Sequence, residues 1–347
     1  MKTSEIIVFI VYLLCMLGIG IFFFVKNRNG GEKTYFLGGR EMGPWVAALS
    51  AGASDMSAWV LMGLPTSIYA LGLGQVWIPV GLAIGYTISW LLEAPRLRKF
   101  SIVANDSITI PQYLTNRFLS KSLALQVICA IVFLVAYTIY AASSVKACGT
   151  LFHTVIGMDP QIAMYLAAVV IVGYTFLGGF SAVCWTDFFQ GMLVLGSMFI
   201  APIFAAFMLD TSSTSALPGG YLNPFSSWQD IVSGLAWGLG YFGMPHILVR
   251  FMSIEKPSMI KKSSIVAIVW VIISLFSAVM IAYFGRMLMG AELLTQGNQK
   301  LVFIAMARRF FPAGICGLLL AAIIAASIST ADSQLLVSSS SFTADLY

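Results

Sequence analysis

The feature that most restricts the fold is a series of apolar runs, each about 20 residues long, that recurs along the whole chain. A helix of that length crosses the roughly 30 Å of hydrocarbon in a bilayer, and in lipid only helices or closed barrels satisfy every backbone hydrogen bond. The composition agrees, since 10% of the residues are charged against about 25% in soluble proteins. We predict an all-α membrane protein with about nine transmembrane helices, near residues 6–25, 45–73, 76–92, 123–143, 162–180, 188–209, 231–249, 265–287 and 311–341.

The basic residues predict the direction in which the chain crosses the membrane. Cytoplasmic loops are enriched in Lys and Arg. If the N-terminus lies outside, the cytoplasmic side holds 13 basic residues and the other side holds 6, so we expect an external N-terminus. The net charge of +5 then reflects topology rather than nucleic-acid binding. The residues assigned to the cytoplasmic loops are Lys26, Arg28, Lys33, Arg40, Arg96, Arg98, Lys99, Arg117, Lys121, Arg250, Lys256, Lys261 and Lys262.

The second apolar run contains a carboxylate, Asp55, among the small residues Gly52, Ala53, Ser54 and Ser57. Ionisable side chains at membrane depth are costly and mark functional sites. Small residues let the backbone leave helical geometry and turn its carbonyl groups toward a bound ion, as in the broken helices of secondary transporters. The segment therefore predicts a cation site in an interrupted helix.

A second interrupted run lies at residues 234–246, which contain four glycines and Pro245. Inverted-repeat transporters carry interrupted helices at corresponding positions of their two halves. With the first run counted as an extra helix, the interrupted runs each begin a five-helix unit. We predict a single domain over 1–347 with a five-plus-five inverted-repeat fold: an extra helix (1–30), a first repeat (44–210) and a partial second repeat (231–347), with 210–230 as an external loop.

A third polar stretch, at residues 325–334, lies within the last apolar run. The hydroxyl groups of Ser329 and Thr330, with the carbonyl of Ala326 one turn earlier, can supply neutral oxygens to a hard cation. The alternative is that these hydroxyls bond to their own backbone or to neighbouring helices.

The chain contains none of the common catalytic motifs, such as HExxH, GxSxG or a P-loop. Its five cysteines are scattered without a CxxC pair, which argues against a zinc site or a disulfide framework. We expect a transporter rather than an enzyme.

Six separated motifs, in the expected order, give the chain a resemblance to the sodium:solute symporter family, and most closely to its proline-transporting bacterial members. The resemblance extends from the first apolar run to Tyr347. The motifs are Leu37-Gly38-Gly39-Arg40, Leu49-Ser50-Ala51-Gly52-Ala53-Ser54-Asp55-Met56-Ser57, Phe176-Leu177-Gly178-Gly179-Phe180, Trp185-Thr186-Asp187, Gly238-Leu239-Gly240-Tyr241-Phe242-Gly243 with Pro245-His246-Ile247-Leu248, and Ser329-Thr330.

The resemblance implies two sets of binding residues. Sodium would be held by backbone oxygens of the first broken helix and by hydroxyl groups of the eighth core helix, at Ala53, Met56, Ala326, Ser329 and Thr330. The substrate pocket would be lined by Ser57, Tyr140, Trp237, Tyr241 and Pro245. Aromatic faces suit the apolar ring of proline, and its ammonium group can lie over such a ring. Trp237 and Tyr241 are also four residues apart, so packing on one helix face is the alternative, and Pro245 alone can mark a kink.

Four charged residues are expected to act in coupling or along the ion pathway. Asp55 would tune the ion site. Asp187 would guide sodium out of the site, or would be a carboxylate at the N-terminus of the sixth run. Asp332 would face the same inner cavity, and Arg40 would belong to the inner gate or to a solvated surface.

The predicted function is sodium-coupled uptake (symport) of L-proline across a bacterial cytoplasmic membrane by alternating access, with Na⁺ as the coupling ion and no other cofactor. Membrane lipid, and not nucleic acid, is the expected surrounding, and the sequence does not indicate an oligomeric state. The alternatives are a symporter for another small amino acid or carboxylate, or a transporter-like sensory domain. Family members continue with four further helices, so we expect this chain to be a piece of a longer protein in which the second repeat is completed. The alternative is a truncated gene product that is unable to alternate access.

Overall fold

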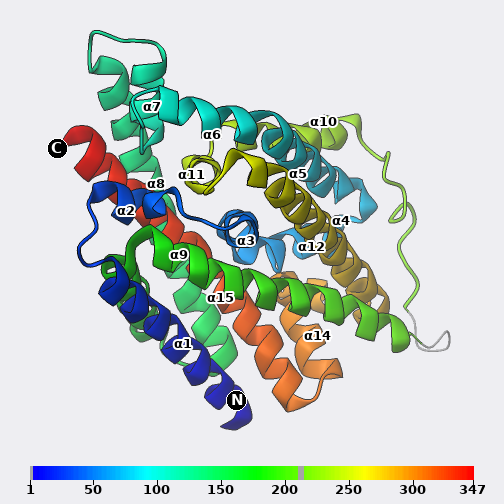
Figure 1. The fold of residues 1–347 in the computed structure, drawn as a ribbon. Helices are drawn as coiled ribbons and strands as arrows, with labels where there is room; N and C mark the ends of the chain where they lie inside the picture. The colour runs from blue at the N-terminus through cyan, green and yellow to red at the C-terminus, as the bar shows by residue number, and fades with distance from the viewer. Residues whose placement is uncertain (1–2, 210–214) are drawn as a thin grey trace.

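The computed structural model describes residues 3–209 and 215–347, and these residues form a bundle of helices (Figure 1). They contain no strand, only an isolated bridge between Met42 and Ile254, so the predicted all-α class is confirmed. Part of the predicted external loop, 210–214, lies outside the described residues.

The first part of the chain forms α1 (Thr3–Asn27), α2 (Glu32–Leu37), η1 (Gly38–Arg40), α3 (Pro44–Met56), η2 (Ala58–Val60), α4 (Gly63–Leu71), η3 (Leu73–Val76), α5 (Trp77–Ile88), η4 (Ser89–Glu93), α6 (Ala94–Val103), α7 (Ile110–Arg117), α8 (Ala124–Ile156) and α9 (Pro160–Phe207). The second part forms α10 (Trp228–Ala236), η5 (Trp237–Gly243), α11 (Pro245–Ser253), η6 (Pro257–Met259), α12 (Ile260–Met289), α13 (Glu292–Thr295), η7 (Gln299–Leu301), α14 (Val302–Phe310), α15 (Ala313–Ser340) and η8 (Ser341–Leu346).

The described part of the chain contains six helical segments long and apolar enough to cross a bilayer, or seven if Trp228–Gly243 and Pro245–Ser253, bent by 49°, count as one. All nine predicted runs fall on helices, but two features lower the count. The second run is divided into α3 and α4. The fifth and sixth runs are joined in α9, whose 48 residues would extend about 72 Å, more than twice the hydrocarbon thickness.

The joined runs of α9 change direction at Gly179, whose φ of 57° and ψ of −154° are not helical. A residue with a side chain would be strained there. This glycine therefore allows one continuous chain segment to form two helices without a loop.

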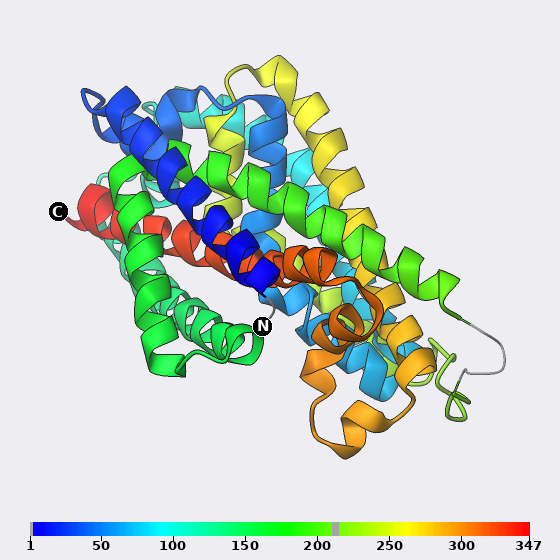
Figure 2. The same cartoon turned by 90° about the horizontal axis from the view of Figure 1, so that it is seen from below.

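α3 lies in the middle of the bundle, where it packs against α9, α11, α12 and α15 (Figure 1). α15 packs against α8 and α9, and α1 lies outside, against α9 and α15 (Figure 2). This arrangement brings the interrupted helix α3 and the polar stretch of α15 together in the interior.

The second interrupted run packs on α5 through glycines. A Cβ atom on Gly85 would lie 2.1 Å from the carbonyl oxygen of Gly238, and one on Gly81 would lie 2.3 Å from the carbonyl oxygen of Gly234. Gly81 and Gly85 on one segment, and Gly234 and Gly238 on the other, each have G-x-x-x-G spacing, which allows close helix contact in membranes. The glycines at 234 and 238 thus serve close packing as well as helix interruption.

Candidate functional site

α3 ends at Met56 because Ser57 adopts φ 47° and ψ −173°. Because the helix stops there, the carbonyl groups of its last turn have no backbone N–H donor from a following turn. Gly52 is required within α3, since a Cβ atom there would lie 2.6 Å from the ring of Trp270. The predicted interruption of the second run is confirmed.

Four of the five predicted sodium residues meet between α3 and α15. The Ser329 hydroxyl donates to the carbonyl of Ala53 at 2.9 Å and is 3.2 Å from the carbonyl of Ala326. Thr330 donates to that same Ala326 carbonyl at 3.1 Å. The fifth residue, Met56, is the buried last residue of α3, so its carbonyl is among those released at the break. The site thus gathers neutral oxygens, the ligands that hard cations prefer.

The alternative given for the hydroxyl groups is also visible, because Ser329 and Thr330 both bond back to their own helix. Ser329 differs in that its oxygen also reaches the backbone of α3. This inter-helix contact is what distinguishes the arrangement from ordinary backbone capping within α15.

Two predicted substrate residues stand on η5 and touch the α3 region. The buried Tyr241 donates its hydroxyl hydrogen to a carboxylate oxygen of Asp55 at 2.6 Å. Its ring packs edge-on against Tyr86 with centroids 5.1 Å apart. Trp237 stacks on Trp59, with centroids 5.2 Å apart and planes 19° from parallel. Trp237 and Tyr241 therefore make different contacts, rather than forming one packed face.

The other three predicted substrate residues are placed as follows. The Ser57 hydroxyl accepts the backbone N–H of Trp59 at 3.1 Å. Pro245 begins α11 at the 49° bend, where proline is favoured in the first helical turn. Tyr140 lies on α8, with its ring 6.4 Å from that of Tyr137. In the described part of the chain, no hydrogen bond or ring contact joins Tyr140 directly to Trp237.

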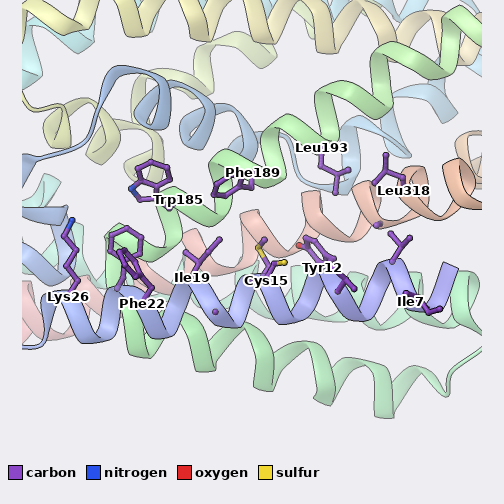
Figure 3. Close-up of a pocket in the computed structure, with 16 residues that line it drawn as sticks. Ile7, Tyr12, Cys15, Ile19, Phe22, Lys26, Trp185, Phe189, Leu193 and Leu318 are labelled. Atoms are coloured by element: carbon purple, nitrogen blue, oxygen red, sulfur yellow. The ribbon is translucent and has the colours of Figure 1, made fainter. Parts of the chain in front are cut away.

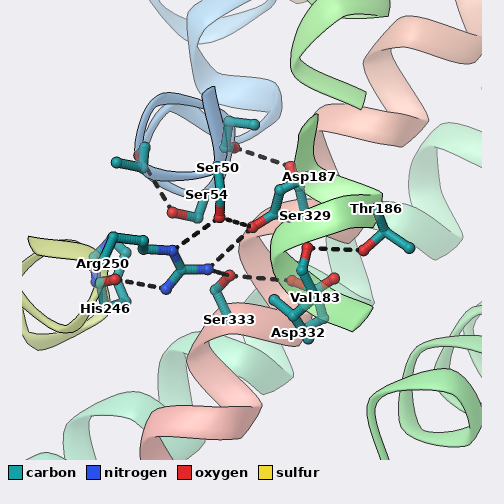
Figure 4. A network of polar contacts seen from close by, with 12 residues as sticks. Ser50, Ser54, Val183, Thr186, Asp187, His246, Arg250, Ser329, Asp332 and Ser333 are labelled. Carbon is teal, nitrogen blue, oxygen red and sulfur yellow. Dashed lines mark hydrogen bonds and ion pairs between the residues drawn. The ribbon is translucent and has the colours of Figure 1, made fainter. Parts of the chain in front are cut away.

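A buried charge network lies beside the ion-site residues (Figure 4). Arg250 of α11 pairs with Asp187 of α9 at 3.0 Å, with side chains 1% and 0% exposed. Ser50 of α3 donates to Asp187 at 2.7 Å and accepts from Arg250 at 3.0 Å. Arg250 also donates to Ser333 of α15 at 2.6 Å. One ion pair therefore ties four helices together.

Asp332 belongs to the same network. Its carboxylate accepts hydrogen bonds from Ser333, at 3.2 Å, and from Tyr174. Because both carboxylates are fully buried, each depends on these donors and on Arg250 for compensation.

The structure corrects two predictions about these charges. Arg250 was expected in a cytoplasmic loop, but it lies within α11 and is buried, because a partner carboxylate from α9 compensates its charge. Asp187 does not lie at a helix N-terminus: it stands eight positions after the bend at Gly179, in the interior of α9. The macrodipole alternative for Asp187 is therefore wrong.

Arg40 forms a separate cluster at the end of α11. It donates to Asp106 at 3.1 Å, to the carbonyl of Met252 at 2.7 Å and to that of Ser107 at 2.8 Å. Burial alone would raise the pKa of Asp106, but its hydrogen bonds and ion pairs with Lys33 and Arg40 lower that pKa below its usual value. Arg40 is 6% exposed, so the solvated-surface alternative is wrong.

Residues 35–347 match the sodium:solute symporter family. The chain belongs to this family. It is 42% identical over 343 residues to the sodium/proline symporters of Staphylococcus aureus strains JH9 and NCTC 8325 / PS 47, covering 97% of this chain and 67% of each relative. In structure it is similar to a Na⁺-coupled sialic acid symporter in a substrate-bound outward-open state, with a TM-score of 0.83, 21% identity, and coverage of 100% of this chain and 75% of that one. That likeness shows the fold.

Membership in the sodium:solute symporter family establishes the coarse function. The family and the named relatives are transporters that couple solute uptake to sodium, so the prediction of a transporter rather than an enzyme is confirmed. The chain is therefore that of a multi-pass membrane transporter with sodium as the coupling ion.

A groove of about 1060 Å³ runs between α1, α9 and α15 (Figure 3). Its lining is apolar, with side chains such as Ile19, Phe189 and Leu318, and Lys26 stands at one end. None of the predicted sodium or substrate residues lines it. Apolar side chains between outer helices are what lipid contact requires, so size alone does not identify the binding site.

Sequence reasoning missed two parts of the site. The Arg250 network was not predicted. Its one signal was Asp187, a carboxylate between two apolar runs, whereas an arginine directly after an apolar run has the pattern of a loop residue. The stacking partner of Trp237, namely Trp59, was also missed. The signal for Trp59 was its place two positions after Ser57, where the second apolar run is interrupted.

Proposed function

We propose that the intact protein takes up L-proline together with Na⁺ across a bacterial cytoplasmic membrane by alternating access. The observation that carries the proposal is the contact between the Ser329 hydroxyl and the Ala53 carbonyl, at 2.9 Å, because it joins the two stretches from which the cation site is predicted. The sodium/proline symporters at 42% identity support the choice of substrate.

A sodium ion would bind between α3 and α15. Hydrogen bonds with oxygen–oxygen distances of 2.9 to 3.2 Å now join the hydroxyl groups of Ser329 and Thr330 to the carbonyl groups of Ala53 and Ala326. A cation between these four oxygens would replace the hydroxyl hydrogens and bind all four oxygens as ligands. Because the oxygens come from two helices, ion binding would hold α3 and α15 together.

The substrate would bind beside Trp237, Tyr241 and Ser57. The hydrogen bond between Tyr241 and Asp55 joins that pocket to the helix that supplies Ala53 and Met56. An ion that orders the end of α3 would therefore also order Tyr241. By linkage, each ligand raises the affinity of the other by the same factor.

The buried network would form part of the inner path. Asp187, Arg250, Ser50 and Ser333 bridge α3, α9, α11 and α15, so these helices can separate only if the contacts break. One carboxylate oxygen of Asp187 has no hydrogen-bond partner within the described residues, which supports its proposed role in guiding the departing ion. Arg40 would belong to the same gate because it holds the end of α11.

The topology completes the proposal. We assign 44–210 and 231–347 to a first repeat and a partial second repeat of inverted orientation, with 1–30 as an extra helix and the N-terminus outside. The assignment is supported by the order of the elements, since α3 stands near the start of the first unit and η5–α11 near the start of the second, as expected of an inverted-repeat transporter.

The test is uptake of radiolabelled proline into proteoliposomes with an inward sodium gradient, with potassium as the matched control. The expected result is accumulation with sodium only, since each 100 mV adds roughly 2.3 kcal/mol per charge to the chemical gradient. Unlabelled proline, other small amino acids and carboxylates are then added as competitors. Uptake that another compound blocks better than proline would replace the substrate, and no uptake of any of them would favour a sensory domain.

A further inference from the structure

Trp59 contacts two other residues of the interrupted helices. Its indole stacks on Trp237, with centroids 5.2 Å apart. It also lies against Gly63, the first residue of α4, where a Cβ atom would stand 2.3 Å from Trp59 Cδ1 and 2.6 Å from Nε1. Any side chain at Gly63 would thus displace the indole.

The backbone of Trp59 is fixed as well. Its N–H donates to the Ser57 hydroxyl at 3.1 Å, and Ser57 is the residue whose positive φ ends α3. The chain therefore places the indole relative to the break in α3, next to the proposed sodium ligands.

Trp237, in contrast, is 47% exposed. A side chain that its neighbours cover only in part keeps rotamer freedom, and ligand binding must remove it. Ordering such a side chain on ligand binding lowers affinity unless another contact has already ordered it. The stack on Trp59 is the ring contact that performs this ordering within the described residues.

We infer that Trp59 is a positioning residue of the substrate site, and that Gly63 provides the space it needs. Trp59 covers one face of Trp237 and directs the other face toward the substrate ring. Two van der Waals contacts of about 3.5 Å each would separate rings on either side of a ligand by about 7 Å, so at 5.2 Å nothing fits between the two indoles. The substrate therefore uses only the free face. This inference rests on the proposed function.

The experiment measures equilibrium binding of radiolabelled proline at saturating sodium, and the sodium dependence of that binding, for the reconstituted protein. Trp59→Ala should weaken proline binding about 2- to 12-fold, the effect of losing one aromatic pair. Trp59→Phe should restore most of the affinity, because it keeps a ring. Gly63→Ala should reproduce Trp59→Ala, whereas Gly196→Ala, where a Cβ atom meets nothing within 4 Å, should bind as wild type.

A double-mutant cycle identifies the route of the effect. If Trp59 acts through Trp237, then Trp59→Ala added to Trp237→Ala should cause no further loss of affinity. The apparent sodium affinity should stay within about twofold of wild type in each single variant. The inference is overturned if the losses of affinity in Trp59→Ala and Trp237→Ala add fully in the double variant, or if Trp59→Ala and Gly63→Ala both bind proline like wild type. Neither result contradicts the proposed transport of proline. If the wild-type protein itself binds no proline, the proposed function fails instead.

Discussion

Replacing Tyr241 by Phe tests whether one hydrogen bond couples the two proposed sites. The substitution keeps the ring, and with it the edge-on contact to Tyr86 at 5.1 Å. It removes only the hydroxyl, which donates to Asp55 at 2.6 Å. The half-buried carboxylate of Asp55, at the end of α3, would then lose the donor that orients it.

The expected size follows from the kind of bond that is lost. A hydrogen bond to a charged group contributes about 1.5–3 kcal/mol, or roughly 12- to 160-fold in an equilibrium constant. Coupling between two sites typically amounts to about 1–3 kcal/mol. The Tyr241→Phe variant should therefore lose most of the factor by which sodium raises proline affinity.

The assay is equilibrium binding of radiolabelled proline over a range of sodium concentrations, which yields the coupling factor directly. Tyr86→Phe is the matched control, because the Tyr86 hydroxyl makes no hydrogen bond with the described residues and the same ring cluster is kept. An unchanged coupling factor in Tyr241→Phe, or an equal loss in both variants, would refute the role of the Tyr241–Asp55 contact.

Three further predictions concern the ion site, the buried network and the helix packing. Ser329→Ala should raise the sodium concentration for half-maximal uptake by about tenfold or more, whereas Ser327→Ala, whose hydroxyl bonds within its own helix, should leave it unchanged. Asp187→Asn should lower the free energy of unfolding by about 3–5 kcal/mol, because Arg250 remains buried without its counter-charge; denaturant unfolding measures this, and wild-type stability would contradict it. Gly85→Ala should cost about 1–3 kcal/mol by overpacking, since its Cβ would lie 2.1 Å from a backbone oxygen of η5; a variant that unfolds like wild type would show that the two backbones can separate freely.

Hydropathy predicts where helices lie in this chain better than it predicts how they are joined. Every predicted run falls on a helix, because an apolar run in lipid has few alternatives. A turn at Gly178-Gly179 is predicted between the fifth and sixth runs, but hydropathy does not predict that the two runs join there without a loop, since a single glycine with positive φ does not alter the hydropathy pattern. The spacing of Gly81 with Gly85, and of Gly234 with Gly238, was a usable signal for the close contact of α5 with the second interrupted run.

The sodium residues could be predicted because their oxygens come from short stretches in which small and polar residues interrupt an apolar run. Ser329 indeed reaches Ala53 across 276 positions in the chain. The ion pair between Arg250 and Asp187 could not be predicted in this way. A charge just after an apolar run has the pattern of a loop residue, and only the tertiary fold supplies its partner 63 positions away.

The most direct test of the account is the affinity of the protein for proline measured with and without sodium, at constant ionic strength maintained with potassium. A sodium ion between α3 and α15 that orders the pocket should raise that affinity by about 5- to 150-fold. Proline should raise the affinity for sodium by the same factor. Equal proline affinity in sodium and in potassium would contradict the claim that the two sites are coupled through α3.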